Sequence, residues 1–301
     1  METRRIGSLD VSVVGLGCNN FGRWVDEAGT RAVVDAAVDA GITLLDTADI
    51  YGRTKSEEFL GRVLKGRRDR IVLATKFGME VAPDKKGAAP DYIRRAVHDS
   101  LRRLATDHID LYQLHQPDPA VPIADTLATM NDLVGDGVVR EIGCSNFSAE
   151  QLHEAAAAVA PGEASFASVQ NELSLLERAD ETDGLAGAAA LHLAYIPYFP
   201  LASGVLTGKY RRGEEPPAGT RLANYKEEVA DEEFDRVEAL TRFAEAHGHT
   251  LLELAFGWLL SHDPVSSVIA GATKPEQAVQ NAAASTWRLT PEERADVNAL
   301  A

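Results

Sequence analysis

Four side chains of this sequence could move or hold a proton, and three of them end short apolar runs. Asp46 ends the run ITLLD, Lys76 ends IVLATK, and His115 ends IDLYQLH. Tyr51 lies in the polar loop that comes after Asp46. A carboxylate, an ammonium, an imidazole and a phenol are all groups that take part in general acid–base catalysis. These four residues are therefore the first candidates for chemistry.

The elements around these residues determine whether they can meet. Short apolar runs bounded by polar segments indicate buried β-strands, and the apolar spacing after Tyr51 predicts a helix over Ser56–Leu64. All four candidates consequently lie at or beyond the carboxyl ends of strands. In a barrel of parallel strands that rim carries the chemistry, so strands of one barrel would bring all four to the same face.

The four candidates also stand in motifs: DTADIYG over residues 46–52, VLATK ending at Lys76, and DLYQLH ending at His115. These motifs resemble, residue by residue, the Asp, Tyr, Lys and His tetrad of the aldo-keto reductases, and nearly the whole chain shares the resemblance. Taken singly, a loop tyrosine, a histidine after a strand and an Asp–Lys ion pair are ordinary structural features. Their joint occurrence in chain order on consecutive strand ends favours the catalytic interpretation.

Apolar runs alternate with helical spacing along the whole chain. The expected strands are Val13–Leu16, Ile42–Leu45, Ile71–Thr75, Ile109–His115, Val138–Cys144, Ala167–Glu172, Ala194–Phe199 and Val265–Ala270. The expected helices are Thr30–Ala40, Ser56–Leu64, Pro90–Leu104, Ile123–Val134, Ala149–Val159, Thr182–His192, Leu251–Leu260 and Pro275–Ser285. Such alternation implies parallel pairing with right-handed crossovers. We therefore predict an α/β fold in which residues 1–301 form a single (β/α)8 TIM barrel domain.

Several segments stand outside this alternation. Met1–Ile6 and Val11–Val14 flank a turn, which predicts an N-terminal β-hairpin, and the resemblance implies that this hairpin closes the bottom of the barrel. Extra C-terminal helices are expected over Asp231–His247 and Pro291–Leu300. The longest irregular segment, Gly204–Lys226, contains prolines and glycines, and loops of that length are commonly functional or disordered.

The stretch GLGCNNFG starts like a dinucleotide-binding fingerprint at Gly15 and Gly17, but Asn20 stands where the third glycine belongs and no helix opens there. A Rossmann site is therefore not expected. Cys18 and Cys144 lack metal-ligand spacing and cannot form a disulfide framework, although either could border the active site.

Charge and composition limit the partners. The 301 residues hold 30 Lys and Arg against 46 Asp and Glu, a formal net charge of −16. This field repels nucleic acid and anionic membranes, so any phosphate-bearing cofactor needs a local basic pocket. The N-terminus has no apolar signal segment and no run could span a bilayer, so we expect a soluble, cytoplasmic protein. We also expect it to be a monomer or a weak homo-oligomer.

A barrel hydrolase that uses His115 with a bound metal is a rival interpretation. It needs several ligands at suitable spacing, whereas His98 and His108 lie on or beside a predicted helix. We therefore expect no metal site.

The resemblance implies a role for each tetrad residue. Tyr51 would be the general acid towards a carbonyl oxygen, and Lys76 would supply the positive charge that lowers the pKa of the phenol. Asp46 would pair with Lys76, because an unpaired buried charge is costly. His115 would orient the carbonyl group of a small-molecule aldehyde or ketone.

The resemblance also implies a nicotinamide cofactor. Residues expected to hold its nicotinamide and pyrophosphate are Ser145, Asn146, Gln170, Tyr198, Phe199, Leu201, Gly204, Lys209 and Arg221. Residues expected at its adenosine end are Gly271, Thr273, Lys274, Gln277 and Asn281. The best-known branch of the family grips a 2′-phosphate with Lys, a hydroxyl residue and Arg, where this chain has Gly271, Ala272 and Gln277. Lys274 with Thr273 would substitute, as in the bacterial branch that this chain resembles, so NADPH is favoured over NADH.

Two matters stay open from the sequence. The substrate is not specified, although Trp24, Phe77 and Met79 are expected to form an apolar wall beside it. The family's fold and tetrad are also shared by potassium-channel β subunits, so an NADP(H)-binding regulatory subunit with little turnover is the alternative to a reductase.

Overall fold

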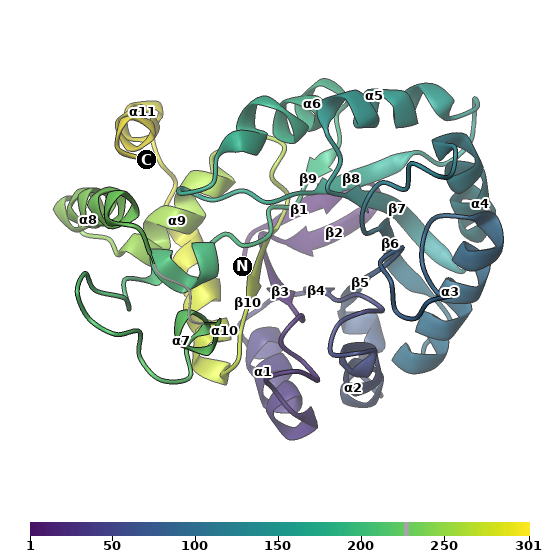
Figure 1. The fold of residues 1–301 in the computed structure, drawn as a ribbon, viewed down its shortest axis with the longest axis horizontal. Helices are drawn as coiled ribbons and strands as arrows, with labels where there is room; N and C mark the ends of the chain where they lie inside the picture. The colour runs from purple at the N-terminus through teal and green to yellow at the C-terminus, as the bar shows by residue number, and fades with distance from the viewer. Residues whose placement is uncertain (226–228) are drawn as a thin grey trace.

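Eight parallel strands form the centre of the computed structural model, which describes residues 1–225 and 229–301 (Figure 1). In order around the sheet they are β10 (Val268–Gly271), β3 (Val14–Gly17), β4 (Leu44–Asp46), β5 (Val72–Phe77), β6 (Ile109–Leu114), β7 (Val139–Ser145), β8 (Phe166–Gln170) and β9 (Ala194–Tyr195). The two edges meet, because the Tyr195 N–H donates to the Pro264 carbonyl at 2.7 Å and the Ser266 N–H donates to the Tyr195 carbonyl at 2.9 Å. The predicted (β/α)8 fold is confirmed.

Helices surround these strands (Figure 1). Those that alternate with them are α1 (Glu27–Asp39), α2 (Lys55–Val63), α3 (Pro90–Leu104), α4 (Ile123–Gly135), α5 (Ala149–Ala158), α6 (Gly184–Ala190), α9 (Leu251–Leu260) and α10 (Pro275–Ala283). Two extra helices, α8 (Asp231–Ala246) and α11 (Pro291–Leu300), pack against each other outside this ring, as predicted. None of the helices in the described ranges combines the length and apolar character needed to cross a bilayer.

The predicted N-terminal hairpin is present as β1 (Thr3–Ile6) paired antiparallel with β2 (Leu9–Ser12). Ile6, Leu9 and Val11 of the hairpin are buried, and they pack against the inward side chains of the barrel strands, such as Leu44 and Leu111. The hairpin thus closes one end of the barrel, so the opposite end is left for the site.

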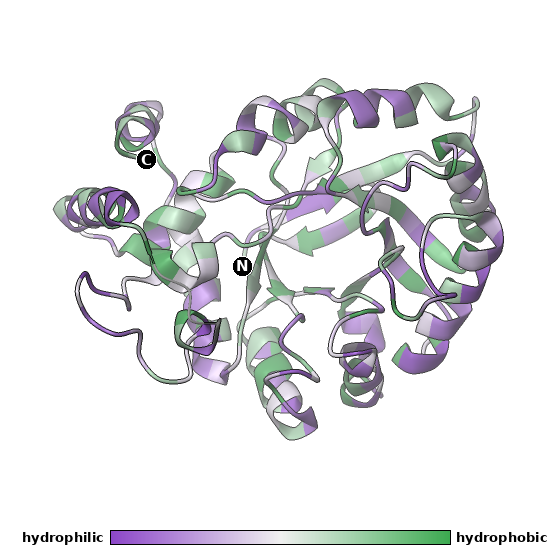
Figure 2. Cartoon of the chain, in the orientation of Figure 1, coloured by the Kyte–Doolittle hydropathy of each residue, from purple (hydrophilic) through white to green (hydrophobic). Residues whose placement is uncertain are grey.

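Alternation along the strands separates an apolar layer from a polar one. On the inner face, the apolar Leu44 and Ala74 lie nearer the hairpin, and Asp46 and Lys76 follow two residues later at the opposite end. Between the strands and the surrounding helices lies the second and larger hydrophobic core, and Figure 2 shows green, hydrophobic segments alternating with purple, hydrophilic ones along the strands. The fold therefore collects polar side chains at one rim.

Three segments differ from the predicted elements. The seventh strand is only two residues long, because Pro197 has no N–H to donate to a ladder. The helix predicted over 182–192 is the shorter α6, which begins at Gly184, and Thr182 belongs to the preceding short helix η2 (Ala179–Thr182). The long loop contains two short helical segments, η3 (Ala202–Thr207) and α7 (Arg221–Tyr225), and its last predicted residue, Lys226, lies outside the described residues.

The remaining short helices are η1 (Arg68–Arg70) and η4 (Ala284–Thr286). In β3, a side chain on Gly15 would collide with Ile269, so this glycine serves barrel packing and is not part of a dinucleotide fingerprint. That all 301 residues form one domain stays our prediction.

Candidate active site

A buried ion pair lies at the rim of the barrel. The Lys76 Nζ donates to Asp46 Oδ2 at 2.6 Å and to the Thr47 carbonyl at 3.0 Å, and the Lys76 side chain is fully buried. The amide groups of Gln113 and Gln170 donate to the other Asp46 oxygen at 3.3 and 3.0 Å. The carboxylate is therefore held by three side chains from three different strands.

Tyr51 stands over this pair at the start of a tight turn. Gly52, Arg53 and Thr54 all have positive φ, and a side chain on Gly52 would collide with the Phe21 carbonyl, so the turn requires glycine there. The Tyr51 ring centroid lies 5.2 Å from the Lys76 Nζ. The same ring meets His115 edge to face, with centroids 5.7 Å apart. The structure thus brings the four residues of the predicted tetrad together.

Burial dominates the ionisation of these groups. It raises the pKa of Tyr51 above its ordinary value, and the nearby Lys76 charge opposes this without reversing it, contrary to our expectation from the sequence. Burial lowers the pKa of Lys76. The Asp46 carboxylate and Tyr51 together raise this pKa by more than burial lowers it, so the net shift is upward. Burial, and then the Lys76 charge, lower the pKa of His115 to about 3. Near neutral pH the site therefore holds a protonated phenol, an ammonium ion and a neutral imidazole.

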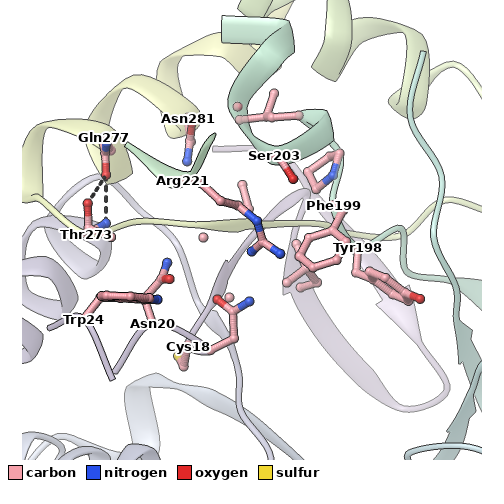
Figure 3. A pocket seen from close by; sticks show the side chains of 18 of the residues that line it. Cys18, Asn20, Trp24, Tyr198, Phe199, Ser203, Arg221, Thr273, Gln277 and Asn281 are labelled. Atoms are coloured by element: carbon pink, nitrogen blue, oxygen red, sulfur yellow. Dashed lines mark hydrogen bonds between the residues drawn. The ribbon is translucent and has the colours of Figure 1, made fainter. Parts of the chain in front are cut away.

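A cavity of about 970 Å³ opens above Tyr51 and His115 and extends to α10. Figure 3 shows Tyr198 and Phe199 on one side of this cavity, Thr273 and Gln277 at its other end, and Arg221 reaching in between them from α7. Trp24 and Met79, which the sequence predicts to lie beside the substrate, also line it. The cavity is long enough to place one end of an extended ligand at the tetrad and the other at α10.

The cavity is locally basic although the chain is acidic. Lys209, Arg221 and Lys274 line it, and Asp46 is the one carboxylate among the described lining residues. The Arg221 guanidinium lies 4.8 Å from the centroid of the Phe199 ring, which fixes its direction across the cavity. In the described part of the chain, no three His, Cys, Asp or Glu side chains are grouped to hold a metal ion.

Residues 13–301 match the model of the Aldo/keto reductase family. This chain belongs to that family. It is 35% identical to aldo-keto reductase YhdN of Bacillus subtilis (strain 168), over 97% of this chain and 90% of that protein. It is 34% identical to a probable voltage-gated potassium channel subunit beta of Oryza sativa subsp. japonica, over 93% of this chain and 90% of that protein.

Two solved structures of the aldo-keto reductase family share the fold. The glycerol dehydrogenase AKR11B4 from Gluconobacter oxydans superposes with a TM-score of 0.86 at 32% identity, covering 99% of this chain and 94% of its own. The aldo-keto reductase AKR11C1 from Bacillus halodurans, in its holo form, gives a TM-score of 0.84 at 33% identity, covering 100% and 96%.

In this member of the aldo-keto reductase family, the polar residues after β7 and β8 form one hydrogen-bonded unit. The Ser145 hydroxyl donates to the Gln170 carbonyl at 2.6 Å, and the Asn146 amide donates to the His115 carbonyl at 2.9 Å. The Tyr198 hydroxyl donates to the Asn146 side-chain oxygen at 2.8 Å. These contacts fix the predicted nicotinamide-facing residues to the same strand ends as the tetrad.

At the α10 end of the cavity, Gln277 satisfies the donors of the helix start. Its side-chain oxygen accepts from the Thr273 N–H at 2.7 Å, the Thr273 hydroxyl at 3.1 Å and the Lys274 N–H at 3.2 Å (Figure 3). An anion that used these donors would have to displace the Gln277 side chain. Four further residues predicted to hold the cofactor also line the cavity: Gly271 and Asn281 at the adenosine end, and Leu201 and Gly204 from the nicotinamide and pyrophosphate set.

The prediction that Phe77 forms part of the substrate wall is wrong. Phe77 is fully buried and stacks on Tyr112 at a centroid distance of 4.7 Å, in the core between strands and helices. It follows Lys76 directly on β5, and neighbouring strand residues point to opposite faces. The inward direction of Lys76 therefore sends Phe77 outward.

Sequence reasoning also missed residues that line the site or support it. Gln113 was detectable, because it precedes His115 by two residues and so shares its face of β6. Asn20 and Gln116 line the cavity from loops, where no periodicity fixes their direction. Of the two cysteines that could border the site, Cys18 lines the cavity and Cys144 is not among the described lining residues.

Proposed function

We propose that this chain reduces an aldehyde or ketone to the alcohol, with NADPH as hydride donor and Tyr51 as proton donor. The observation that carries the proposal is the position of Tyr51 and His115, above the Lys76–Asp46 pair and at one end of a cavity whose other end is basic. The reverse reaction, oxidation of an alcohol, uses the same groups.

The residues divide the proton chemistry among them. When bound, the nicotinamide supplies a hydride to the carbonyl carbon, and negative charge develops on the carbonyl oxygen. Tyr51 donates its proton to that oxygen, and Lys76 stabilises the tyrosinate that forms. Because His115 is neutral, it can donate a hydrogen bond to the same oxygen without competing as the acid. Asp46 holds the ammonium in place.

The chain's own residues fit an extended anionic cofactor. Ser145, Asn146 and Gln170 present amide and hydroxyl groups beside the tetrad, and Tyr198 offers a ring against which a flat group can stack. Further along, the cationic side chains of Lys209, Arg221 and Lys274 meet the need for a local basic pocket. Lys274 with Thr273, at the start of α10, supports NADPH over NADH.

Fluorescence titration with NADPH and NADH tests the cofactor, and loss of NADPH absorbance with an aromatic aldehyde tests the reaction. We expect NADPH to bind at least tenfold more tightly, and Lys274→Met to reduce this ratio, since it removes one charge that faces the 2′-phosphate. Lys65→Met is the matched control, because Lys65 is exposed and does not line the cavity.

Three outcomes separate the possible functions. Binding with turnover supports the reductase. Tight NADPH binding without turnover of a broad carbonyl panel would favour the alternative, a regulatory NADP(H)-binding subunit. Failure of both nucleotides to bind would contradict the proposal.

A further inference from the structure

Asp49 lies within the DTADIYG motif, between Asp46 and Tyr51, but its side chain has no part in the cavity. Its backbone N–H donates to the Lys76 carbonyl at 3.1 Å, which ties the Tyr51 loop to β5. Its carboxyl group is only 2% exposed and faces residues of α2 and α3. A shift of this side chain would therefore act directly on the segment that carries Tyr51.

The charges around Asp49 do not balance. Glu57, from α2, is fully buried, and Arg103 Nε donates to one of its oxygens and the Thr75 hydroxyl to the other, each at 2.6 Å. Among the residues that the structure describes, the Asp49 carboxyl group has only the Tyr92 side chain and the Ile50 backbone as hydrogen-bonding neighbours, neither of which is positively charged. Two buried carboxyl groups thus share one guanidinium. Within the described residues, the Asp49 Oδ1 atom has no hydrogen-bond partner.

The other ionisable groups near Asp49 supply no further positive charge. From α3, Tyr92 interacts with its carboxyl group, and Asp99 lies beyond Tyr92. From β6, Tyr112 is fully buried and its hydroxyl has no hydrogen-bond partner in the described part of the chain. Lys76, on β5, is already paired with Asp46 of β4.

We propose that Asp49 is a positioning residue for Tyr51, and that it holds the Tyr51 loop in its productive arrangement as the neutral carboxylic acid. This inference rests on the proposed function. Burial, and then the Glu57 charge, raise the pKa of Asp49 to about 7, although Arg103 opposes the shift. Deprotonation leaves a second buried negative charge beside one guanidinium, and such a charge is costly unless water or a donor reaches it. Hydrating it requires the loop to move, which displaces Tyr51 from Lys76 and His115.

The Asp49→Asn variant separates this role from a merely structural one, because asparagine imitates the neutral acid and cannot ionise. A group with a pKa near 7 is neutral about tenfold more often at pH 6 than at pH 8. We therefore expect the ratio of kcat at pH 6 to kcat at pH 8 to be about tenfold larger in the wild type than in Asp49→Asn. The exposed Asp84→Asn is the control and should keep the wild-type profile.

Thermal unfolding of the protein without cofactor gives an independent readout. A folded-state pKa raised above the unfolded value of about 3.9 means that the wild type loses stability as pH rises from about 4 to 7. Asp49→Asn should therefore melt at a higher temperature than the wild type, by a margin that is small at pH 5 and grows towards pH 8. A variant that melts lower at every pH, or that keeps the wild-type pH profile of kcat, would overturn the inference.

The two proposals fail in different ways. Absence of carbonyl turnover in both proteins at every pH would refute the proposed function, and the role of Asp49 in turnover with it. Turnover with identical pH profiles in both proteins would refute the role of Asp49 alone.

Discussion

Replacing Asp46 with asparagine should destabilise the fold strongly as well as stop turnover. The substitution keeps the shape of the side chain but removes the charge that lies 2.6 Å from the Lys76 ammonium. Both side chains are nearly inaccessible to water, at 4% and 0% exposure, so solvent cannot replace the lost partner. The variant must bury a lone ammonium ion or leave Lys76 unprotonated.

The size of the effect follows from this burial. Removing one partner of a buried ion pair typically costs about 3–5 kcal/mol, a large part of a total stability of about 5–15 kcal/mol. The double variant Asp46→Asn/Lys76→Met removes both charges, so it should cost less than the sum of the two single variants, by about 2 kcal/mol or more. It should not be neutral, because the Thr47 carbonyl loses the Lys76 ammonium as its donor inside the barrel.

Urea unfolding at pH 7, followed by both fluorescence and circular dichroism, measures these free energies and checks that the transitions coincide. The matched control is Asp132→Asn, because Asp132 forms an ion pair of the same 2.6 Å length with Arg94 but both groups are about half exposed. That substitution should cost at most about 1 kcal/mol. A cost below about 1 kcal/mol for Asp46→Asn, or additive costs in the double variant, would refute the reasoning.

Two further predictions concern the cavity and the core. Gln277→Ala should free the backbone N–H donors of Thr273 and Lys274 for the 2′-phosphate of NADPH. We therefore expect the ratio of the NADH to the NADPH dissociation constant to rise about fivefold in fluorescence titrations. An unchanged ratio would contradict the competition between Gln277 and the 2′-phosphate. Trp24→Ala should raise KM for an aromatic aldehyde with little effect on the free energy of urea unfolding. Phe77→Ala should instead cost about 3–5 kcal/mol of stability and leave KM unchanged. The reverse pattern would restore Phe77 to the substrate wall.

The tetrad could be located from the sequence because each member has a local signal. Asp46, Lys76 and His115 each end an apolar run, and parallel strands place such ends at one rim. The same alternation could have excluded Phe77 and identified Gln113, since strand neighbours point to opposite faces and residues two apart share one face.

The ionisation of the site was less predictable. The pKa of Tyr51 depends on how completely the folded chain removes water from the phenol, and no residue spacing records this. At the start of α10, the Gln277 side chain accepts hydrogen bonds from the backbone N–H groups before the helix, and the sequence does not fix the direction that this side chain takes. The Asp49 and Glu57 carboxyl groups share Arg103, which is distant in sequence and comes near only when α2 packs on α3.

The most direct test of the account is turnover by Tyr51→Phe, which removes one hydroxyl oxygen from the site. Tyr112→Phe is the matched control, because Tyr112 is fully buried in the core, does not line the cavity, and its hydroxyl has no hydrogen-bond partner among the described residues. We predict that kcat for carbonyl reduction falls about 10²–10⁴-fold in Tyr51→Phe while the NADPH dissociation constant stays within about threefold, and that Tyr112→Phe keeps near wild-type turnover. Retention of more than a tenth of the wild-type kcat by Tyr51→Phe, with NADPH bound normally, would contradict the assignment of Tyr51 as the proton donor.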